Sequence, residues 1–171
     1  PDIIYHAAAL KHVSICEDNA AEAIRTNIFA TEILSNLAEK YKSKCFILIS
    51  TDKAVRPSSV MGATKKIAES IIQSKDRFSQ YKTRFITVRF GNVLGSQGSV
   101  VPLFKKQISE GGPVTVTNKE VSRFFMTIKE AVALVLNATL EQYNSKVKLR
   151  GVINVLNMGA SVKIDILAKQ M

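Results

Sequence analysis

The apolar run Cys-Phe-Ile-Leu-Ile-Ser at residues 45–50 constrains the fold more than any other feature of the chain. A run without polar alternation is typical of a strand that is covered on both faces, as in a parallel sheet. Residues 3–8 and 84–90 have a similar strand-like character, and residues 17–41 and 57–79 carry apolar side chains at helical spacing. Strands that alternate with helices predict an α/β fold with a doubly wound parallel sheet and right-handed crossovers.

The second half of the chain has a less regular pattern. It predicts, in order, a Gly- and Ser-rich loop at 91–98, a helix at 99–110, a strand at 114–117, a helix at 129–143, a strand at 151–156 and a helix from 164 onward. The sequence Gly111-Gly112-Pro113 is a strong signal for the end of a helix. In the first half, Asp18 or Asn19 is expected to cap the helix at 17–41.

Composition excludes several classes of protein. The 171 residues carry a net charge of +10, and residues 36–89 hold twelve basic and four acidic residues, which is +8 of that total. A basic chain suggests nucleic acid, an anionic surface or phosphate-bearing ligands, but we find no aromatic stacking motif and no recognition helix, so no nucleic acid is expected. No apolar run approaches the roughly 18–20 residues of a membrane helix.

The cysteines and histidines give no sign of a metal site or a disulfide framework. Cys16 and Cys45 are interpreted as buried thiols of a reducing compartment, and the protein is expected to be cytoplasmic. His6 and His12 have no metal-ligand spacing with a carboxylate pair, so no metal is expected. Because the chain begins at Pro1 and ends within a predicted helix, we expect it to be a segment of a longer protein.

Polar and small residues follow three of the predicted strands. They are Ala7-Ala8-Ala9, then Ser50-Thr51-Asp52-Lys53, then Arg89-Phe90-Gly91-Asn92. Ligands of open α/β sheets bind at the carboxyl ends of the strands, so these ends are expected to line one crevice. Met61 and Lys65 share one face of the next helix, and Lys65 is expected to project back toward Thr51 and Asp52.

These residues carry a resemblance to a known family. The four stretches that carry it are His-Ala-Ala-Ala-Leu-Lys-His at 6–12, Ser-Thr-Asp-Lys-Ala-Val at 50–55, Met-Gly-Ala-Thr-Lys at 61–65 and Arg-Phe-Gly-Asn-Val-Leu-Gly-Ser at 89–96. They resemble the extended short-chain dehydrogenase/reductase superfamily, and within it the nucleotide-sugar 4,6-dehydratases that act on UDP-N-acetylglucosamine in polysaccharide and glycan biosynthesis. The resemblance continues through residues 98–104, 111–117 and 123–127.

The resemblance implies a fold and an incomplete cofactor site. The chain would hold the C-terminal part of a Rossmann-type sheet, with residues 1–98 as a partial NAD-binding domain that includes the catalytic loop. Residues 99–171 would form part of a sugar-nucleotide-binding α/β region interleaved with the last Rossmann elements. The family's glycine-rich fingerprint precedes this segment, so the segment alone is expected to be inactive and to bind NAD or NADP poorly.

The resemblance also implies roles for particular residues. Asp52 would protonate the departing C6 hydroxyl, Lys53 would remove the C5 proton, Thr51 would hydrogen-bond the 4-oxygen, and Lys65 would hold the nicotinamide ribose. The remaining cofactor contacts would come from Ala7, Ala8, Ala9, Asn27, Ser50 and Arg89. The substrate, a UDP-sugar, would contact Lys11, Asn92, Val100, Thr115, Val116 and Arg123, with Arg123 on the diphosphate.

Met61 is where the chain departs from most of the superfamily. Most members have Tyr four residues before the Lys, and a thioether cannot perform the proton transfer of a phenol. Met at this position resembles the long, membrane-anchored members of the dehydratase group, whose anchors lie upstream; this implies the cytoplasmic face of the inner membrane for such a protein. A homo-oligomer is also expected.

Two further interpretations remain open. One is a nucleotide-sugar 4-epimerase or a C5-inverting dehydratase of the same superfamily, and the other is an inactive, truncated binding module. Asp52 and Lys53 distinguish the first from a 4,6-dehydratase, because simple epimerases do not need an acid and a base for elimination across C5 and C6. The start at Pro1 favours the second for the isolated chain.

Overall fold

The computed structural model describes residues 1–96, 98–144 and 149–171. The chain divides into two compact units, each made of two segments. The first unit comprises Pro1–Arg89 with Val135–Leu156, and the second comprises Phe90–Leu134 with Asn157–Met171. None of the helices in the described ranges is both long and apolar enough to cross a membrane.

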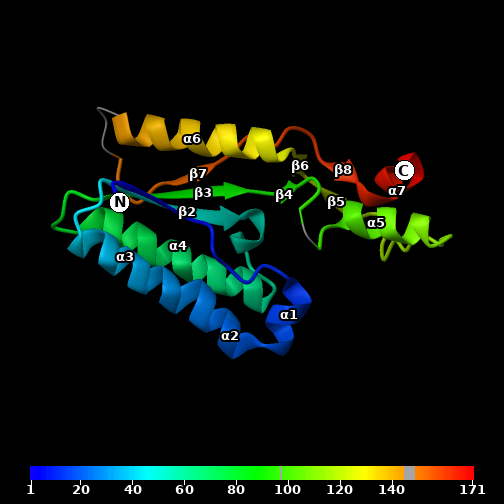
Figure 1. The fold of residues 1–171 in the computed structure, drawn as a ribbon, viewed down its shortest axis with the longest axis horizontal. Coiled ribbons are helices and arrows are strands. Elements are labelled where there is room, and N and C mark those ends of the chain that lie inside the picture. Colours follow the sequence, from blue (N-terminus) through cyan, green and yellow to red (C-terminus); the bar gives the residue numbers. More distant parts are fainter. Residues whose placement is uncertain (97, 145–148) are drawn as a thin grey trace. The chain divides into compact units, whose positions relative to one another are not determined.

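The first unit is built on a four-stranded sheet (Figure 1). Its strands are β1 (Ile3–His6), β2 (Cys45–Thr51), β3 (Arg84–Phe90) and β7 (Ile153–Val155), in the spatial order β1-β2-β3-β7. β1 pairs with β2 in parallel and β3 pairs with β7 in parallel. The predicted parallel α/β fold is therefore confirmed. The strand predicted at 3–8 ends earlier, at His6, while β2 runs one residue beyond its predicted end, to Thr51.

The segment between β1 and β2 differs from the single helix predicted at 17–41. It consists of α1 (Val13–Asp18), α2 (Ala20–Ile24), a π-helical segment (Arg25–Phe29) and α3 (Ala30–Lys40). The helical conformation is interrupted at Asn19, whose backbone has φ −132° and ψ 53°. Its side chain does not cap the following helix, because the amide nitrogen donates to the carbonyl of Ile15. The predicted cap at Asp18 or Asn19 is therefore wrong.

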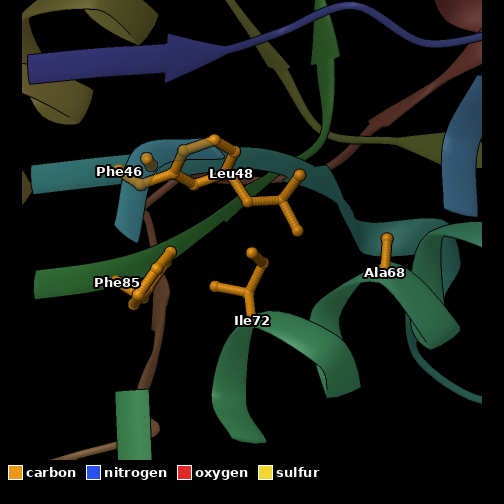
Figure 2. Packing of buried hydrophobic residues seen from close by; sticks show 6 residues of the cluster. Phe46, Leu48, Ala68, Ile72 and Phe85 are labelled. Atoms are coloured by element: carbon orange, nitrogen blue, oxygen red, sulfur yellow. The ribbon is translucent and has the colours of Figure 1, made fainter. Parts of the chain in front are cut away.

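Two helices cover one face of this sheet, α3 and α4 (Val60–Phe78) (Figure 1). The core between them is a cluster of Ala38 from α3, Phe46 and Leu48 from β2, Phe85 from β3, and Ala68 and Ile72 from α4. Figure 2 shows Ile72 and Ala68 facing the side chains of the two strands. The rings of Phe46 and Phe85 pack in a tilted geometry with centroids 5.8 Å apart. Apolar residues on both faces of β2 explain its unbroken hydrophobic sequence.

The second unit contains short strands and helices. β4 (Asn92–Val93) pairs in parallel with β6 (Phe125–Met126), and β5 (Ser122–Arg123) pairs antiparallel with β8 (Val162–Lys163). The helices are α5 (Val100–Ser109) and α7 (Ile164–Gln170), and α6 (Ile128–Asn144) begins in this unit and ends in the first. The loop predicted at 91–98 thus contains β4, and Gln97 within it lies outside the described residues.

The strand predicted at 114–117 is wrong, since the structure has no strand there. Thr115 is held instead by the side chain of Gln107 in α5. Its backbone N–H donates to Gln107 Oε1 at 3.1 Å, and its hydroxyl accepts from Gln107 Nε2 at 2.7 Å. A side-chain amide therefore satisfies the backbone group that a ladder would otherwise engage.

Asp76 at the end of α4 joins three segments of the first unit. Its carboxylate accepts from the backbone N–H of Phe85 (3.0 Å) and of Gly151 (2.7 Å), and from the guanidinium groups of Arg84 (2.7 Å) and Arg150 (3.0 Å). The Asp76 side chain is 1% exposed. Gly151 has φ +67°, a conformation that favours glycine, so its N–H reaches the carboxylate without strain. This buried carboxylate fixes the start of β3 and the approach to β7 against α4.

We expect Asp76→Asn to destabilise the protein by about 3–5 kcal/mol, because it leaves buried cationic and N–H donors facing a neutral amide. Urea denaturation would measure the loss. The control Glu110→Gln removes an exposed partner of Lys106 on α5, 3.8 Å away, and should change stability by less than about 0.5 kcal/mol. A loss of similar size for both variants would show that the buried carboxylate has no special role.

Candidate active site

A hydrogen-bonded chain of three consecutive residues follows β2. Thr51 caps the 3-10 helix Asp52–Ala54 by accepting from the backbone N–H of Lys53 at 3.4 Å. Its hydroxyl donates to Asp52 Oδ1 at 2.9 Å, and Lys53 Nζ donates to the same oxygen, also at 2.9 Å. The side chains of Lys53 and Asp52 are 34% and 28% exposed, so both are accessible to a ligand. The structure therefore brings together Thr51, Asp52 and Lys53, three of the five residues predicted for the catalytic group.

This arrangement can supply an acid and a base from one pair of side chains. In the ion pair, Lys53 carries the proton and Asp52 the negative charge. Transfer of one proton along the 2.9 Å hydrogen bond gives a neutral amine and a carboxylic acid with the same total number of protons. A ligand that displaces water from the pair favours this neutral form, because desolvation penalises charge. The pair is thus chemically suited to remove one proton and donate another.

Lys65 lies on α4 and is almost completely buried, with 6% of its surface exposed. Its ammonium donates at 2.7 Å to the carbonyl of Ile49, two residues before Thr51 in β2, so the side chain projects toward this end of the strand. Burial lowers the pKa of Lys65 from its ordinary value to about 8, and the negative charge of Glu69 opposes this decrease. The structure therefore places a cation of weakened basicity at the carboxyl end of β2.

Met61 is a packing residue in this structure. It is 3% exposed and forms a cluster with Cys16 of α1 and Ala23 of α2, against which Leu10 and Val60 also pack. A thioether neither donates nor accepts a proton in acid–base chemistry. Proton transfer at this site must therefore use other groups.

Gly62 explains how α4 approaches the Thr51–Lys53 segment so closely. A Cβ atom at this position would lie 2.5 Å from the carbonyl oxygen of Lys53, so no other residue fits without a shift of backbone. The side chain of Ser59 caps the helix by accepting from the N–H of Gly62 at 3.1 Å. Sequence reasoning did not identify this close approach, although a Gly inside a helical pattern is a signal for one.

Asn27 holds the loop after β1. Its side-chain oxygen accepts from the N–H of Leu10 at 2.8 Å, and its amide nitrogen donates to the carbonyl of Leu10 and to the hydroxyl of Thr64, each at 3.0 Å. One acceptor and two donor groups of the amide are thus used within the protein. The π-helical segment places this side chain between the loop after β1 and α4.

His6, at the end of β1, is a buried group that sequence reasoning did not assign to this site. Its Nε2 lies 3.0 Å from the hydroxyl of Thr31, which itself donates to the carbonyl of Asn27 at 2.8 Å. Since the Thr31 proton is already used, Nε2 must carry the hydrogen of the neutral imidazole. Burial, and secondarily the charge of Lys65, lowers the pKa of His6. His6 is therefore held neutral beneath the site.

Ser50 and Arg89, predicted as cofactor contacts, both bind Glu69. Ser50 Oγ donates to Glu69 Oε1 at 2.6 Å, while Arg89 donates from Nε to Oε1 at 2.7 Å and from Nη2 to Oε2 at 2.5 Å. The Glu69 side chain is fully buried, and the Arg89 side chain is 12% exposed. Glu69 is not among the residues predicted for this site, although it lies four residues after Lys65 and the two side chains therefore share one helix face.

The second unit contains a pocket of about 300 Å³. Three predicted substrate residues, Asn92, Val100 and Arg123, line it, whereas Thr115 and Val116 do not. Ser99, the residue before α5, also lines the pocket, and its hydroxyl oxygen is buried with no hydrogen-bond partner among the residues the structure describes. An unsatisfied buried hydroxyl beside a helix N-terminus and a guanidinium suits an anionic ligand. Lys11, also predicted to bind substrate, is exposed in the first unit.

The residues of the first unit fit part of a nicotinamide dinucleotide. Ala7 and Ala8 present exposed backbone with small side chains after β1, where a flat ring can approach closely. Lys65 offers an ammonium with three N–H donors near the carboxyl end of β2, a chemistry that suits ribose hydroxyl groups. No group of three or more candidate metal ligands occurs in the described part of the chain.

Comparison with known proteins places the chain in a family of polysaccharide biosynthesis proteins. The sequence profile described as "Polysaccharide biosynthesis protein" matches residues 1–171. The chain is 54% identical to the capsular polysaccharide biosynthesis protein CapD of Staphylococcus aureus over 171 residues, which is all of this chain and 27% of CapD. It is also 41% identical over 169 residues to a UDP-glucose 4-epimerase of Rickettsia rickettsii, covering 98% of this chain and 48% of that protein. The chain thus spans between about a quarter and a half of these relatives.

Solved structures confirm the Rossmann-like architecture. Pen from Bacillus thuringiensis superposes with a TM-score of 0.89 at 40% identity, over 98% of this chain and 51% of that one. DesIV from Streptomyces venezuelae, a dTDP-glucose 4,6-dehydratase with NAD bound, superposes with a TM-score of 0.84 at 18% identity, over 99% of this chain and 56% of that one. At that identity the second likeness shows the fold alone.

We expect Lys65→Met to stabilise the protein at neutral pH. The pKa of about 8 in the folded state lies below the ordinary 10.5, so the unfolded chain binds this proton more tightly. The charged amine then costs roughly 3 kcal/mol below pH 8, a cost that fades as the pH rises from about 8 toward 10.5. Urea denaturation should show a higher free energy of unfolding for Lys65→Met than for the wild type at pH 7, and a smaller difference at pH 10.

Lys66→Met is the matched control for this experiment, because Lys66 is the next residue of α4 and is exposed. It should change stability little at either pH. A loss of stability in Lys65→Met at pH 7 would mean that the buried ammonium is a structural anchor and would contradict this prediction.

Proposed function

The chain belongs to the polysaccharide biosynthesis protein family, and we propose that it carries the catalytic residues of an NAD-dependent 4,6-dehydratase acting on a UDP-N-acetylhexosamine. The observation that carries the proposal is the hydrogen-bonded chain Thr51–Asp52–Lys53 at the carboxyl end of β2. Elimination of water across two carbons needs one group that accepts a proton and one that donates a proton.

Each residue of the chain has a distinct task in the proposed reaction. Bound NAD would supply the hydride chemistry, taking a hydride from C4 and returning it to C6. Thr51 hydrogen-bonds the oxygen on C4 and stabilises negative charge there. Lys53 removes the proton on C5, which the neighbouring ketone acidifies, and Asp52 protonates the departing hydroxyl on C6. The proton of the 4-hydroxyl would leave through Thr51 and Asp52 to solvent, and Lys53 would return its proton to C5 when C6 is reduced. Lys65 binds the nicotinamide ribose.

The ion pair between Asp52 and Lys53 is compatible with these tasks. A charged pair has the wrong protonation for both roles, since the base already holds a proton and the acid has none. The neutral pair has the right protonation, and it forms by one proton transfer between atoms 2.9 Å apart. We propose that the bound sugar displaces water from this partly exposed pair and so favours the neutral form.

The pocket of the second unit is proposed to hold the nucleotide diphosphate. Arg123 supplies a guanidinium, Ser99 a hydroxyl and α5 its N-terminal N–H groups, all of which favour phosphate oxygens. Asn92 and Val100 line the same pocket. Lys11, Thr115 and Val116 remain proposed substrate contacts on the strength of the resemblance alone.

A 4-epimerase is the second candidate, because a relative named UDP-glucose 4-epimerase matches 98% of the chain at 41% identity. An epimerase oxidises C4 and reduces the same carbon, so it loses no water. Asp52 and Lys53 would then have no elimination to perform. The two candidates therefore differ in whether these side chains are essential.

We expect Lys53→Met and Asp52→Asn, each made in the protein encoded by the complete gene, to reduce formation of the 4-keto-6-deoxy sugar by at least ~100-fold, while NAD binding is retained. Mass spectrometry of the sugar nucleotide would follow the loss of water, and calorimetry would follow NAD binding. Lys66→Met, on an exposed position of α4, serves as the control. Epimerisation at C4 without loss of water, undiminished in Lys53→Met, would establish the epimerase instead.

We also expect Arg123→Met to raise the KM for the sugar nucleotide roughly tenfold or more with a smaller change in kcat, because a charged hydrogen bond to phosphate is worth about 1.5–3 kcal/mol. Steady-state kinetics would measure both constants. Lys105→Met removes an exposed charge from α5 in the same unit and should leave both unchanged. An unchanged KM in Arg123→Met would remove Arg123 from the diphosphate site.

A further inference from the structure

The cluster formed by Ser50, Glu69 and Arg89, which we call the Glu69 cluster, connects three elements behind the catalytic segment. Glu69 extends from α4, Ser50 precedes Thr51 in β2, and Arg89 lies near the end of β3. Both oxygens of the carboxylate are occupied: Oε1 accepts from Ser50 and from Arg89 Nε, and Oε2 accepts from Arg89 Nη2. A two-pronged guanidinium contact of this kind fixes position as well as charge.

Lys65 would be the natural partner of Glu69 in an isolated helix. The two residues are four positions apart on α4, a spacing at which Lys and Glu commonly pair. In the folded protein, however, the fork of Arg89 occupies the carboxylate, and Lys65 Nζ donates to the carbonyl of Ile49 instead. The carbonyl that holds Lys65 and the hydroxyl that binds Glu69 belong to consecutive residues of β2, Ile49 and Ser50.

We propose that Glu69 and Arg89 are positioning residues for Lys65: by binding Glu69 at both oxygens, Arg89 keeps the carboxylate away from Lys65, whose amine is then directed to the end of β2. This inference rests on the proposed function for its consequence, namely that Lys65 is presented to the cofactor ribose. It gives Ser50 and Arg89 a role through the protein itself. Without Arg89, Lys65 and Glu69 would form the usual pair along the helix, and the amine would leave Ile49.

The electrostatics of Lys65 agree with this geometry. Burial lowers its pKa to about 8, and Glu69 counteracts that effect only in part. The elements packed around α4 contribute other charged or titratable groups. They are His6 at the end of β1, Asp52 and Lys53 after β2, Arg89 in β3 and Glu17 of α1. Glu17 accepts from the N–H of Val60, at the start of α4. Of these, Arg89 is the group that directly neutralises the anion on the helix face of Lys65.

Direct titration of the Lys65 amine tests the proposal without an activity assay. The Nζ and Cε signals of Lys65, assigned by their loss in Lys65→Met, would be followed by NMR across pH 6–11 in the complete protein. Arg89→Met frees Glu69 to pair with Lys65 and should raise the titration midpoint of Lys65 by roughly one pH unit. Glu69→Gln removes the anion and should lower this midpoint by a similar amount. Opposite shifts are a signature that a merely structural role would not give.

Two additional variants keep the test decisive. Glu69→Gln combined with Arg89→Met removes both members of the ion pair, so neither is left without its partner, and Lys65 should titrate close to its wild-type pH. Glu39→Gln makes the same carboxyl-to-amide change in the Lys75 ion pair, 2.6 Å long, between α3 and α4, and should leave Lys65 unchanged.

Shifts in the same direction for the two single variants, or no shift in either, would overturn the proposal. If neither single variant folds, the double variant decides. A Lys65 titration midpoint near the wild-type pH supports the proposal, and a shift of that midpoint by about one pH unit or more overturns it. Failure of the proposed dehydratase activity would leave these titrations unaffected, so the two inferences fail separately.

Discussion

The packing of α4 against β2 is the constraint on which the first unit depends. Ala68 and Ile72 of the helix meet Phe46 and Leu48 of the strand in the core, and the same helix presents Lys65 and Glu69 to the strand's carboxyl end. A single interface therefore combines an apolar half with a charged half. The apolar half provides the burial that stabilises the fold, and the charged half is tolerated because nearly every polar atom in it has a partner.

The sequence predicted the parallel sheet because apolar runs such as residues 45–50 directly reflect burial on both faces. It did not predict the interruption at Asn19 or the π-helical segment, because apolar spacing across 17–41 is compatible with one long helix. It also predicted a strand at Val114–Thr117, where alternation with threonine resembles a strand. Local propensity there was overridden by the Gln107 side chain, a tertiary contact that no local pattern contains.

The candidate site divides in the same way. Thr51, Asp52 and Lys53 are adjacent in the chain, so their proximity required no knowledge of the fold. Glu69 and Thr31 reach the site only because helices and strands pack together: the spacing of Glu69 from Lys65 shows that they share a helix face but not that Glu69 binds Ser50 and Arg89. Ser50, Arg89 and Asn27, predicted by resemblance as cofactor contacts, also form hydrogen bonds within the protein, and these bonds depend on the tertiary packing.

The π-helical segment Arg25–Phe29 has a consequence for how this region tolerates change. An α-helix advances by about 100° per residue, and a π-helical turn accommodates an extra residue. Removal of one residue here would restore regular helix, yet it would rotate Asn27 out of phase with Thr31, Ser35 and Ala38, which form the buried face of α3. Length in this segment is therefore under tighter constraint than residue type. Substitutions at the exposed positions of the segment are compatible with the fold, whereas an insertion or deletion of a single residue would displace the Asn27 side chain that holds the loop after β1.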